Sequence, residues 1–334
     1  MTIPDDEVVG ARRSAGLFDL ADRGVLEVLG SDARRWLNGM LTNDVARLEA
    51  GAERSGCPAL VLTNRGRVIA DVEVLVVPGG FWLETSRAAA ADLAIRLSRF
   101  VIADDVRLAD RSDDLARFAV EGPAARRVVE AASGAALRLA PHACAEALVA
   151  GARVLVARFG WSGEDAVQVF AAREDAEHVR ARLVAALAGV GGRACSAQAL
   201  EALRIEAGRP RLGAELSEEV LPPEARLEDS ISYTKGCYTG QEIVARLRSR
   251  GHVNHLLVGL RFAGDTPPPP GTALRAGDKK VGEITSAVRS PHAGAIALAY
   301  VRVGYDAAGT ELDADGALAR VAALPFVAPH EAVA

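Results

Sequence analysis

The chain has 334 residues, of which 50% are hydrophobic, and a formal net charge of −5 at pH 7. This length allows two or three domains, each with a core of its own. The negative charge and the low aromatic content argue against a dedicated nucleic-acid-binding protein. No apolar run approaches the roughly 20 residues that span a bilayer, and the acidic N-terminus is unlike a signal peptide. We therefore expect a cytoplasmic protein that does not enter a membrane.

The cysteines are scattered singly, without a Cys-x-x-Cys pair, at Cys57, Cys144, Cys195 and Cys237. This distribution argues against a disulfide framework and against a zinc or iron–sulfur site built by this chain alone. His252 and His255 have a spacing that could seat a metal on a helix. They fall in a turn-to-strand region without further ligands nearby, so we expect no metal site.

Hydrophobic periodicity predicts alternating strands and helices up to residue 208. Runs rich in β-branched residues give the strands, and apolar patterns of helical period give the helices. The predicted order is a strand at 25–29, a helix at 32–41, hairpin strands at 59–63 and 68–77, a strand at 81–85, a helix at 88–100, strands at 119–123, 153–159 and 166–170, a helix that ends at 189–192, and a helix at 200–208. This alternation is typical of α+β or α/β domains.

Two acidic residues interrupt the second strand of the predicted hairpin. Asp71 and Glu73 are two positions apart, so their side chains point to the same face of the strand. Carboxylates on a core-facing side would be costly, so this face is either exposed to water or part of a polar pocket. The sequence alone favours exposure to water and leaves the pocket open.

The turn at 160–165 reads Gly-Trp-Ser-Gly-Glu-Asp and joins two predicted strands. Trp161 in this turn and Gln168 in the next strand offer an aromatic face and a side-chain amide. Together they could grip a flat heterocycle that carries hydrogen-bond donors and acceptors. A packed tryptophan that only covers the hairpin is the simpler alternative.

The segment 235–242 reads Lys-Gly-Cys-Tyr-Thr-Gly-Gln-Glu and precedes an amphipathic pattern. Thr239 and Glu242 have the spacing of a capping box, which predicts that a helix begins here. Cys237 would then lie near the positive end of this helix and near the ammonium of Lys235, and both would favour its thiolate form. A tight turn with a small buried cysteine is the alternative.

These segments resemble those of the YgfZ proteins, the folate-binding relatives of the aminomethyltransferase (T-protein) of the glycine cleavage system. The segment 235–242 is the most specific, because it has a cysteine after Lys-Gly where the T-protein has a residue without a thiol. Five weaker segments follow the family's order, at 16–20, 41–45, 160–165, 203–208 and 282–286.

The resemblance implies an α+β fold, a T-protein-like three-domain ring. Residues 1–250 would form a folate-binding core of two interleaved subdomains. Residues 251–334 would form a C-terminal β-barrel, in agreement with short β-rich runs and glycine turns beyond residue 251. The subdomains would comprise 1–50 with 108–125 and 195–250, and 51–107 with 126–194.

The resemblance also assigns site residues by motif position. Asp71, Trp161, Gln168 and Arg204 would bind a tetrahydrofolate or a one-carbon derivative of it. The carboxylate of the T-protein is kept at Asp71, whereas its tyrosine has become Trp161 and its glutamate has become Gln168, which cannot carry a charge. Cys237, Lys235 and Asp71 would supply the catalytic groups.

Three functions remain open. The resemblance implies a monomeric tetrahydrofolate-binding protein for iron–sulfur cluster assembly or repair, with Cys237 as its reactive group and with client or assembly proteins as partners. The alternative is a folate-dependent aminomethyltransferase or demethylase that transfers a one-carbon unit to tetrahydrofolate. A third possibility is an interaction module that has kept the ring and lost its ligand.

Overall fold

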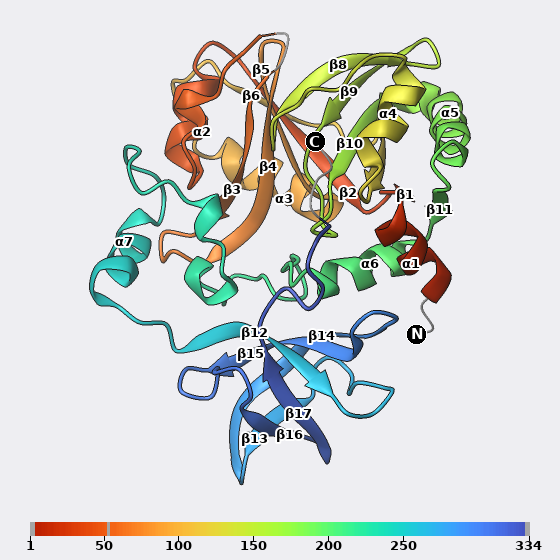
Figure 1. Cartoon of the computed structure of the whole chain (residues 1–334). Coiled ribbons are helices and arrows are strands. Elements are labelled where there is room, and N and C mark those ends of the chain that lie inside the picture. The colour runs from red at the N-terminus through yellow and green to blue at the C-terminus, as the bar shows by residue number, and fades with distance from the viewer. Residues whose placement is uncertain (1–3, 52–53, 331–334) are drawn as a thin grey trace.

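A computed structural model describes residues 4–51 and 54–330 of the chain. Two β-sheets stand side by side in the upper half of the molecule, and a closed barrel lies below them (Figure 1). The α+β class and the three-part organisation with a C-terminal barrel are therefore confirmed. Among the described residues, no helix is long and apolar enough to cross a membrane.

The first sheet has five strands in the order β3-β4-β5-β2-β6, and all neighbours are antiparallel. Helices α2 and α3 pack on one face of it and close an apolar core that includes Trp36, Leu37, Leu83 and Leu93. The elements are β2 (Arg23–Leu29), α2 (Ala33–Met40), β3 (Gly56–Leu62), β4 (Val68–Val77), β5 (Gly80–Ser86), α3 (Arg87–Ser98) and β6 (Arg107–Asp110), with the short 3₁₀ helix η1 (Val45–Arg47) after α2.

The second sheet has six strands in the order β11-β1-β7-β10-β9-β8. Only β1 and β11 run parallel, and helices α4 and α5 cover the apolar core on its outer face. The elements are β1 (Gly16–Asp19), β7 (Leu115–Glu121), α4 (Ala125–Ser133), β8 (Cys144–Val149), β9 (Ala152–Ala157), β10 (Ala166–Ala172), η2 (Arg173–Asp175), α5 (Ala176–Ala188) and β11 (Arg193–Cys195).

The strands divide between the sheets differently from the expected subdomains. The strands β3 to β5, within 51–107, lie in one sheet with β2, whereas β8 to β10, within 126–194, lie in the other sheet with β1 and β7. The expected grouping of 51–107 with 126–194 therefore does not describe the sheets. The chain leaves the second sheet at Asp19 and enters the first at Arg23. A loop this short gives no sequence signal of a change of sheet.

The C-terminal barrel closes in the order β12-β15-β14-β13-β16-β17. Its strands are β12 (His255–Phe262), β13 (Ala273–Ala276), β14 (Lys279–Ser290), β15 (Gly294–Arg302), β16 (Glu311–Ala314) and β17 (Ala317–Ala322). Helices α1 (Asp5–Arg13) and α6 (Ala197–Glu206) lie between the second sheet and the barrel (Figure 1). Their apolar sides share a core with barrel residues such as Leu257, Ile296 and Leu298.

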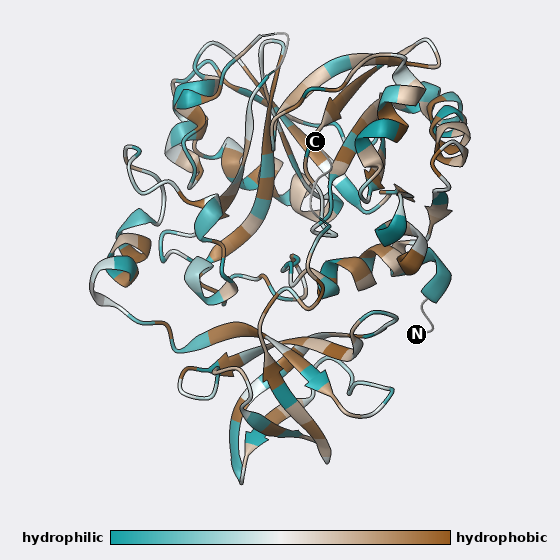
Figure 2. Ribbon diagram, viewed as in Figure 1, coloured by the Kyte–Doolittle hydropathy of each residue, from teal (hydrophilic) through white to brown (hydrophobic). Residues whose placement is uncertain are grey.

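The inner faces of the two sheets meet across a smaller apolar cluster. Val25 and Leu75 come from the first sheet, and Leu155 and Phe170 from the second. Brown, apolar stretches run along the strands of both sheets, whereas the helices carry both brown and teal positions (Figure 2). Polar side chains gather beside this cluster, toward α6, and form the candidate site.

A long connection links α6 to the barrel along the first sheet. It contains the 3₁₀ helices η3 (Pro222–Ala225) and η4 (Glu228–Ser230) and then α7 (Gln241–Arg250). Apolar residues of this connection, among them Ile231 and Val244, pack on Leu60 and Val68 of the hairpin β3–β4. The connection thus covers the outer edge of the first sheet.

Candidate functional site

A cleft of about 280 Å³ opens between the loop after β1, the turn that contains Trp161, and helix α6. Its walls carry an aromatic ring and several charged groups. They include Arg23, Trp161, Leu200, Glu201, Arg204 and Arg211. Two of the four residues expected to bind the cofactor, Trp161 and Arg204, therefore line one cleft.

The backbone of the turn holds Trp161 in place. The N–H groups of Trp161 and Ser162 donate to the carboxylate of Glu121, at 3.1 and 2.7 Å. Glu121 is fully buried at the end of β7, and burial raises the pKa of its carboxyl group despite these donors. The indole also packs against the edge of Phe159, with ring centroids 6.0 Å apart, and under the guanidinium of Arg23 at 5.0 Å. The ring thus presents a fixed face to the cleft.

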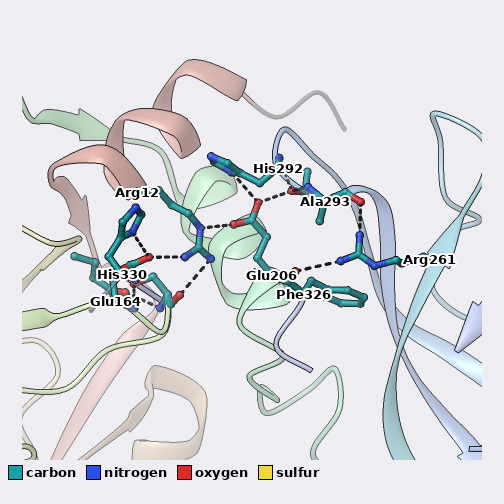
Figure 3. A network of polar contacts seen from close by, with 11 residues as sticks. Arg12, Glu164, Glu206, Arg261, His292, Ala293, Phe326 and His330 are labelled. Carbon is teal, nitrogen blue, oxygen red and sulfur yellow. Dashed lines mark hydrogen bonds and ion pairs between the residues drawn. The ribbon is translucent and has the colours of Figure 1, made fainter. Parts of the chain in front are cut away.

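The far end of the turn is anchored at Glu164. Arg12 of α1 donates to Glu164 at 2.7 Å and to Glu206 at the end of α6 at 2.6 Å (Figure 3). His330, in the C-terminal segment, donates its backbone N–H to the same Glu164 carboxylate at 3.0 Å. Two segments that are distant in the sequence, α1 and the C-terminal segment, thus hold this turn, and α6 holds Arg12 in place.

Asp71 lies on β4, on the side that faces the second sheet. Its Oδ1 is buried and has no hydrogen-bond partner among the described residues. Burial raises the pKa of Asp71, the charge of Arg23 opposes this shift, and the charge of Glu84 adds to it. Arg211, which also lines the cleft, lowers the pKa slightly. The aspartate is therefore within electrostatic reach of the cleft and holds a proton more readily than a free carboxyl group.

The sequence analysis did not predict the buried ion network that lies beside Asp71. Glu84 of β5 accepts from Nε and Nη2 of Arg23, at 2.6 and 2.9 Å, and from Nη1 of Arg117 on β7, at 2.5 Å. Burial opposes the ionisation of Glu84, but the two guanidinium groups outweigh it and lower its pKa. The sequence did contain a signal of this network, namely single charged residues inside otherwise apolar strands. Charged side chains are almost never fully buried unless they are paired, so each of them indicates a partner.

Buried Glu73 forms a second polar pair between the sheets, with the partly exposed His142. Its Oε1 lies 2.6 Å from Nδ1 of His142, which precedes β8. Burial raises the pKa of Glu73. Burial also works against a charged imidazole, but the hydrogen bond and the charge of Glu73 raise the pKa of His142. Asp71 and Glu73 therefore share a polar region between the sheets, and the expectation that water covers this face is wrong.

Gln168 is fully buried on β10. Its Nε2 donates to the carbonyl of Phe159 at 2.9 Å, and its Oε1 has no partner among the described residues. Because Phe159 packs against Trp161, the amide stands directly behind the aromatic wall of the cleft. The structure thus has two buried acceptor atoms, Asp71 Oδ1 and Gln168 Oε1, that receive no hydrogen bond from the described residues.

Arg204 lines the cleft, but the protein itself occupies its donors. Its Nε and Nη2 donate to Glu201, at 2.9 and 2.5 Å. Its Nη1 donates to Glu215 and to the carbonyl of Arg209, and Nη2 also reaches the hydroxyl of Ser286 in the barrel. All five N–H groups of the guanidinium are thus engaged. Arg204 ties α6 to the barrel and supports the floor of the cleft.

Lys235 is held by backbone carbonyl groups. Its ammonium donates to the carbonyls of Asn38, Leu41 and Asn43, at 2.6 to 2.7 Å, where α2 ends. Burial lowers the pKa of Lys235 to about 8. Cys237 is exposed and is not among the residues that line the cleft. The structure therefore does not bring these two residues together with Asp71.

The helix that follows begins without the expected capping box. Gly240 is its N-cap, with φ +83°, and no side chain caps the first turn. Instead, the side chain of Gln241 accepts from the backbone of Tyr238, and the backbone N–H of Thr239 donates to Gly39. The segment 235–242 packs against α2 and the turn of the hairpin β3–β4, so it holds the helix and the hairpin together.

Comparisons with known proteins agree on one family. Residues 2–235 match the GCVT N-terminal domain, and residues 256–329 match the glycine cleavage T-protein C-terminal barrel domain. The aminomethyltransferase of Streptomyces avermitilis is 32% identical over 91% of this chain and 83% of its own length. That of Rubrobacter xylanophilus is 35% identical over 87% of this chain and 77% of its own length.

A solved structure shares the fold. The glycine cleavage system aminomethyltransferase T of Bartonella henselae superposes with a TM-score of 0.86 at 23% identity, over 97% of this chain and 89% of its own. These matches overturn the assignment to the YgfZ proteins. The relatives at 32% and 35% identity are named aminomethyltransferases. The cysteine that suggested YgfZ lies outside the cleft, and a role with iron–sulfur partners has no support.

Proposed function

The chain belongs to the glycine cleavage T-protein family, and from this premise we propose that it is an aminomethyltransferase that transfers a one-carbon unit to tetrahydrofolate. Aminomethyltransferases of this family use tetrahydrofolate, as the sequence led us to expect. The pair of unpartnered acceptors, Asp71 Oδ1 and Gln168 Oε1, is the observation that carries the proposal. Buried polar atoms of native proteins are normally paired, so a missing partner points to a ligand.

The residues present fit a reduced pterin. The ring of such a cofactor is flat and offers N–H donors along its edge, the kind of group that both acceptors lack. Trp161 lines the cleft with an aromatic ring; Arg23 lies over one of its faces, so a pterin would contact the remaining surface of the ring. Gln168 presents an oxygen without bringing a charge into a fully buried position. Neutral Gln168 therefore suits recognition better than proton transfer.

Asp71 is the group we assign to proton transfer. When bound, tetrahydrofolate supplies the nitrogen atoms that accept the one-carbon unit. A carboxyl group whose pKa is raised by burial exchanges a proton near neutral pH more readily than an exposed one. Arg23 and Glu84 hold their own charges in a fixed pair beside it, so the aspartate works in a preorganised field.

The first experiment measures folate binding. Titration of the purified full-length protein with 5-formyltetrahydrofolate should quench the fluorescence of Trp161 and raise the melting temperature. Gln168→Leu should weaken binding about tenfold, because it removes one acceptor of the ligand. If saturating folate leaves fluorescence and melting temperature of the wild type unchanged, the ligand assignment is wrong.

The second experiment measures transfer. The protein should form methylenetetrahydrofolate from an aminomethylated carrier protein and release ammonia, whereas a methylated amine in place of the carrier would show a demethylase. Asp71→Asn should lower kcat by about 10² or more with little change in folate affinity. Asp92→Asn, an exposed aspartate on α3, is the matched control. Equal turnover by Asp71→Asn and the wild type would remove Asp71 from the mechanism.

A third variant tests Cys237, one of the two other catalytic candidates. Cys237→Ala changes an exposed thiol that does not line the cleft. We propose that turnover survives this change, because aminomethyl transfer at the cleft needs no group from that position. A loss of turnover at unchanged melting temperature would return the thiol to the mechanism.

A further inference from the structure

A second cavity, of about 340 Å³, lies on the other side of Arg23 from the candidate cleft. It shares Asp19, Leu20 and Arg23 with that cleft and is otherwise lined by different residues. Five arginines line it: Arg23, Arg87, Arg117, Arg173 and Arg180. The carboxylates in its walls are those of Asp19 and Glu177, and Glu84 and Asp113 pair with arginines of the lining, so five arginines meet four carboxylates and a net positive charge remains.

Arg117 is the innermost of these arginines and is incompletely paired. It is 5% exposed, and its Nη1 donates to Glu84 at 2.5 Å. Its Nε and Nη2 are buried and have no hydrogen-bond partner among the described residues. Nε–H and an Nη2–H point in parallel along one edge of the guanidinium, which is the edge that binds both oxygens of a carboxylate or phosphate.

The buried guanidinium groups of Arg23 and Arg117 are also incompletely neutralised, which favours binding of an anion. Arg23 and Arg117 share the single carboxylate of Glu84, and burial penalises the charge of Arg117, as its lowered pKa shows. The guanidinium of Arg117 stacks 4.3 Å above the ring of Phe170, which fixes its plane. A buried cation that lacks acceptors is costly, and an anionic ligand at its open edge would offset that cost.

The rim of the cavity favours the entry of anions. Arg173 donates to the carbonyls of Ser112 and Asp113 and forms no ion pair among the described residues, whereas Arg87 pairs with the carboxylate of Asp113. Arg180 is neutralised by Asp19 through hydrogen bonds of 3.0 to 3.1 Å. Leu20 and Phe118 supply an apolar wall, and both are buried. This pattern suits a small organic molecule with an anionic end.

We propose that this cavity binds a small organic oxyanion, a carboxylate or a phosphate, through the free Nε–Nη2 edge of Arg117. The site is distinct from the cleft at Trp161, and the proposal does not depend on one-carbon transfer. Arg117 binds the oxyanion end, and the apolar wall receives the body of the ligand. Arg173 at the rim attracts the ligand by its charge.

The test is calorimetric titration of the full-length protein with inorganic phosphate and, separately, with glutarate, with chloride added to keep the ionic strength constant. We expect saturable one-site binding of at least one of them, and the anion preferred names the ligand class. Arg117→Met should weaken this binding about tenfold or more, since it removes two charge-assisted hydrogen bonds. Arg182→Met on the same helix as Arg180, where Arg182 donates to carbonyls outside the cavity, should bind like the wild type.

Two further measurements guard against a folding defect in Arg117→Met. Arg117→Lys keeps the charge and loses the two-pronged edge, so it should also bind more weakly than the wild type. In crystals of the wild type soaked with selenate, the anomalous signal should lie within hydrogen-bond distance of Arg117 Nε and Nη2. The proposal is overturned if neither anion saturates, if both Arg117 variants bind like the wild type, or if selenate avoids the cavity.

Discussion

At the scale of single residues, burial of the Asp71 carboxylate destabilises the folded state. Its Oδ1 is buried without a partner, and burial raises the pKa of the carboxyl group. The folded state therefore binds a proton at pH values where the unfolded chain, with an ordinary pKa of about 3.9, has already lost it. Stability must then fall as pH rises through the window that begins near this ordinary value. Such costs are common at functional sites.

Asp71→Asn should remove this cost. The amide cannot ionise, so the variant should be more stable than the wild type at pH 8, by about 1 kcal/mol, the typical size of a single-site effect. Below about pH 3 Asp71 is protonated in both the folded and the unfolded chain, so the pH-dependent part of the difference should vanish. Urea unfolding of the two proteins at both pH values measures the difference.

Asp92→Asn serves as the reference for that measurement. Asp92 is about half exposed and pairs with Arg96 one turn away on α3, so its replacement should change stability by less than about 0.5 kcal/mol at either pH. A variant Asp71→Asn that is less stable than the wild type at pH 8 would show that the attraction to Arg23 outweighs burial.

At the scale of secondary-structure elements, the segment 235–242 acts through its backbone. Gly240 has φ +83°, and a Cβ added there would lie 2.5 Å from the carbonyl oxygen of Thr63. At the other end of the segment, Lys235 donates hydrogen bonds to the carbonyls where α2 ends. The motif that suggested a reactive cysteine is thus explained by its contacts with the first sheet.

Gly240→Ala should therefore destabilise the protein, while Gly236→Ala should not. The first change combines a left-handed backbone with a clash, and we expect a loss of about 2 kcal/mol. Gly236 has nothing within 4 Å of the position of an added Cβ, so its replacement should cost well under 1 kcal/mol. Thermal unfolding of the two variants gives the comparison. Equal melting temperatures would mean that the turn can shift to accept a side chain.

The sequence predicted the positions of strands and helices better than it predicted which of them pair or pack together. The hairpin expected at 59–63 and 68–77 is observed as Gly56–Leu62 and Val68–Val77, because β-branched runs around a glycine turn are local signals. The assignment of β1 and β2 to different sheets depends on packing between distant segments, which no local pattern encodes. Charge pairs such as Glu84 with Arg117 also join distant positions, so each partner looked like an isolated charge.

At the scale of the whole molecule, buried ion pairs join the same parts that shared apolar clusters bring together. Glu84 and Arg117 join the two sheets, and Arg204 joins α6 to the barrel through Ser286. Arg12 joins α1 and α6 to the turn that carries Trp161 (Figure 3). A change in any of these contacts should alter the cleft, because its walls belong to different parts of the molecule.

Arg12→Met tests this coupling. It leaves Glu206 and Glu164 buried without their main cation, and removal of one partner from a buried pair costs about 3–5 kcal/mol. The turn at Trp161 loses an anchor at the same time, so folate affinity should fall together with the midpoint of urea unfolding. Arg13→Met, at the adjacent exposed position, should change neither quantity beyond about 0.5 kcal/mol. If Arg12→Met loses stability but binds 5-formyltetrahydrofolate like the wild type, the ion network supports the fold without positioning Trp161.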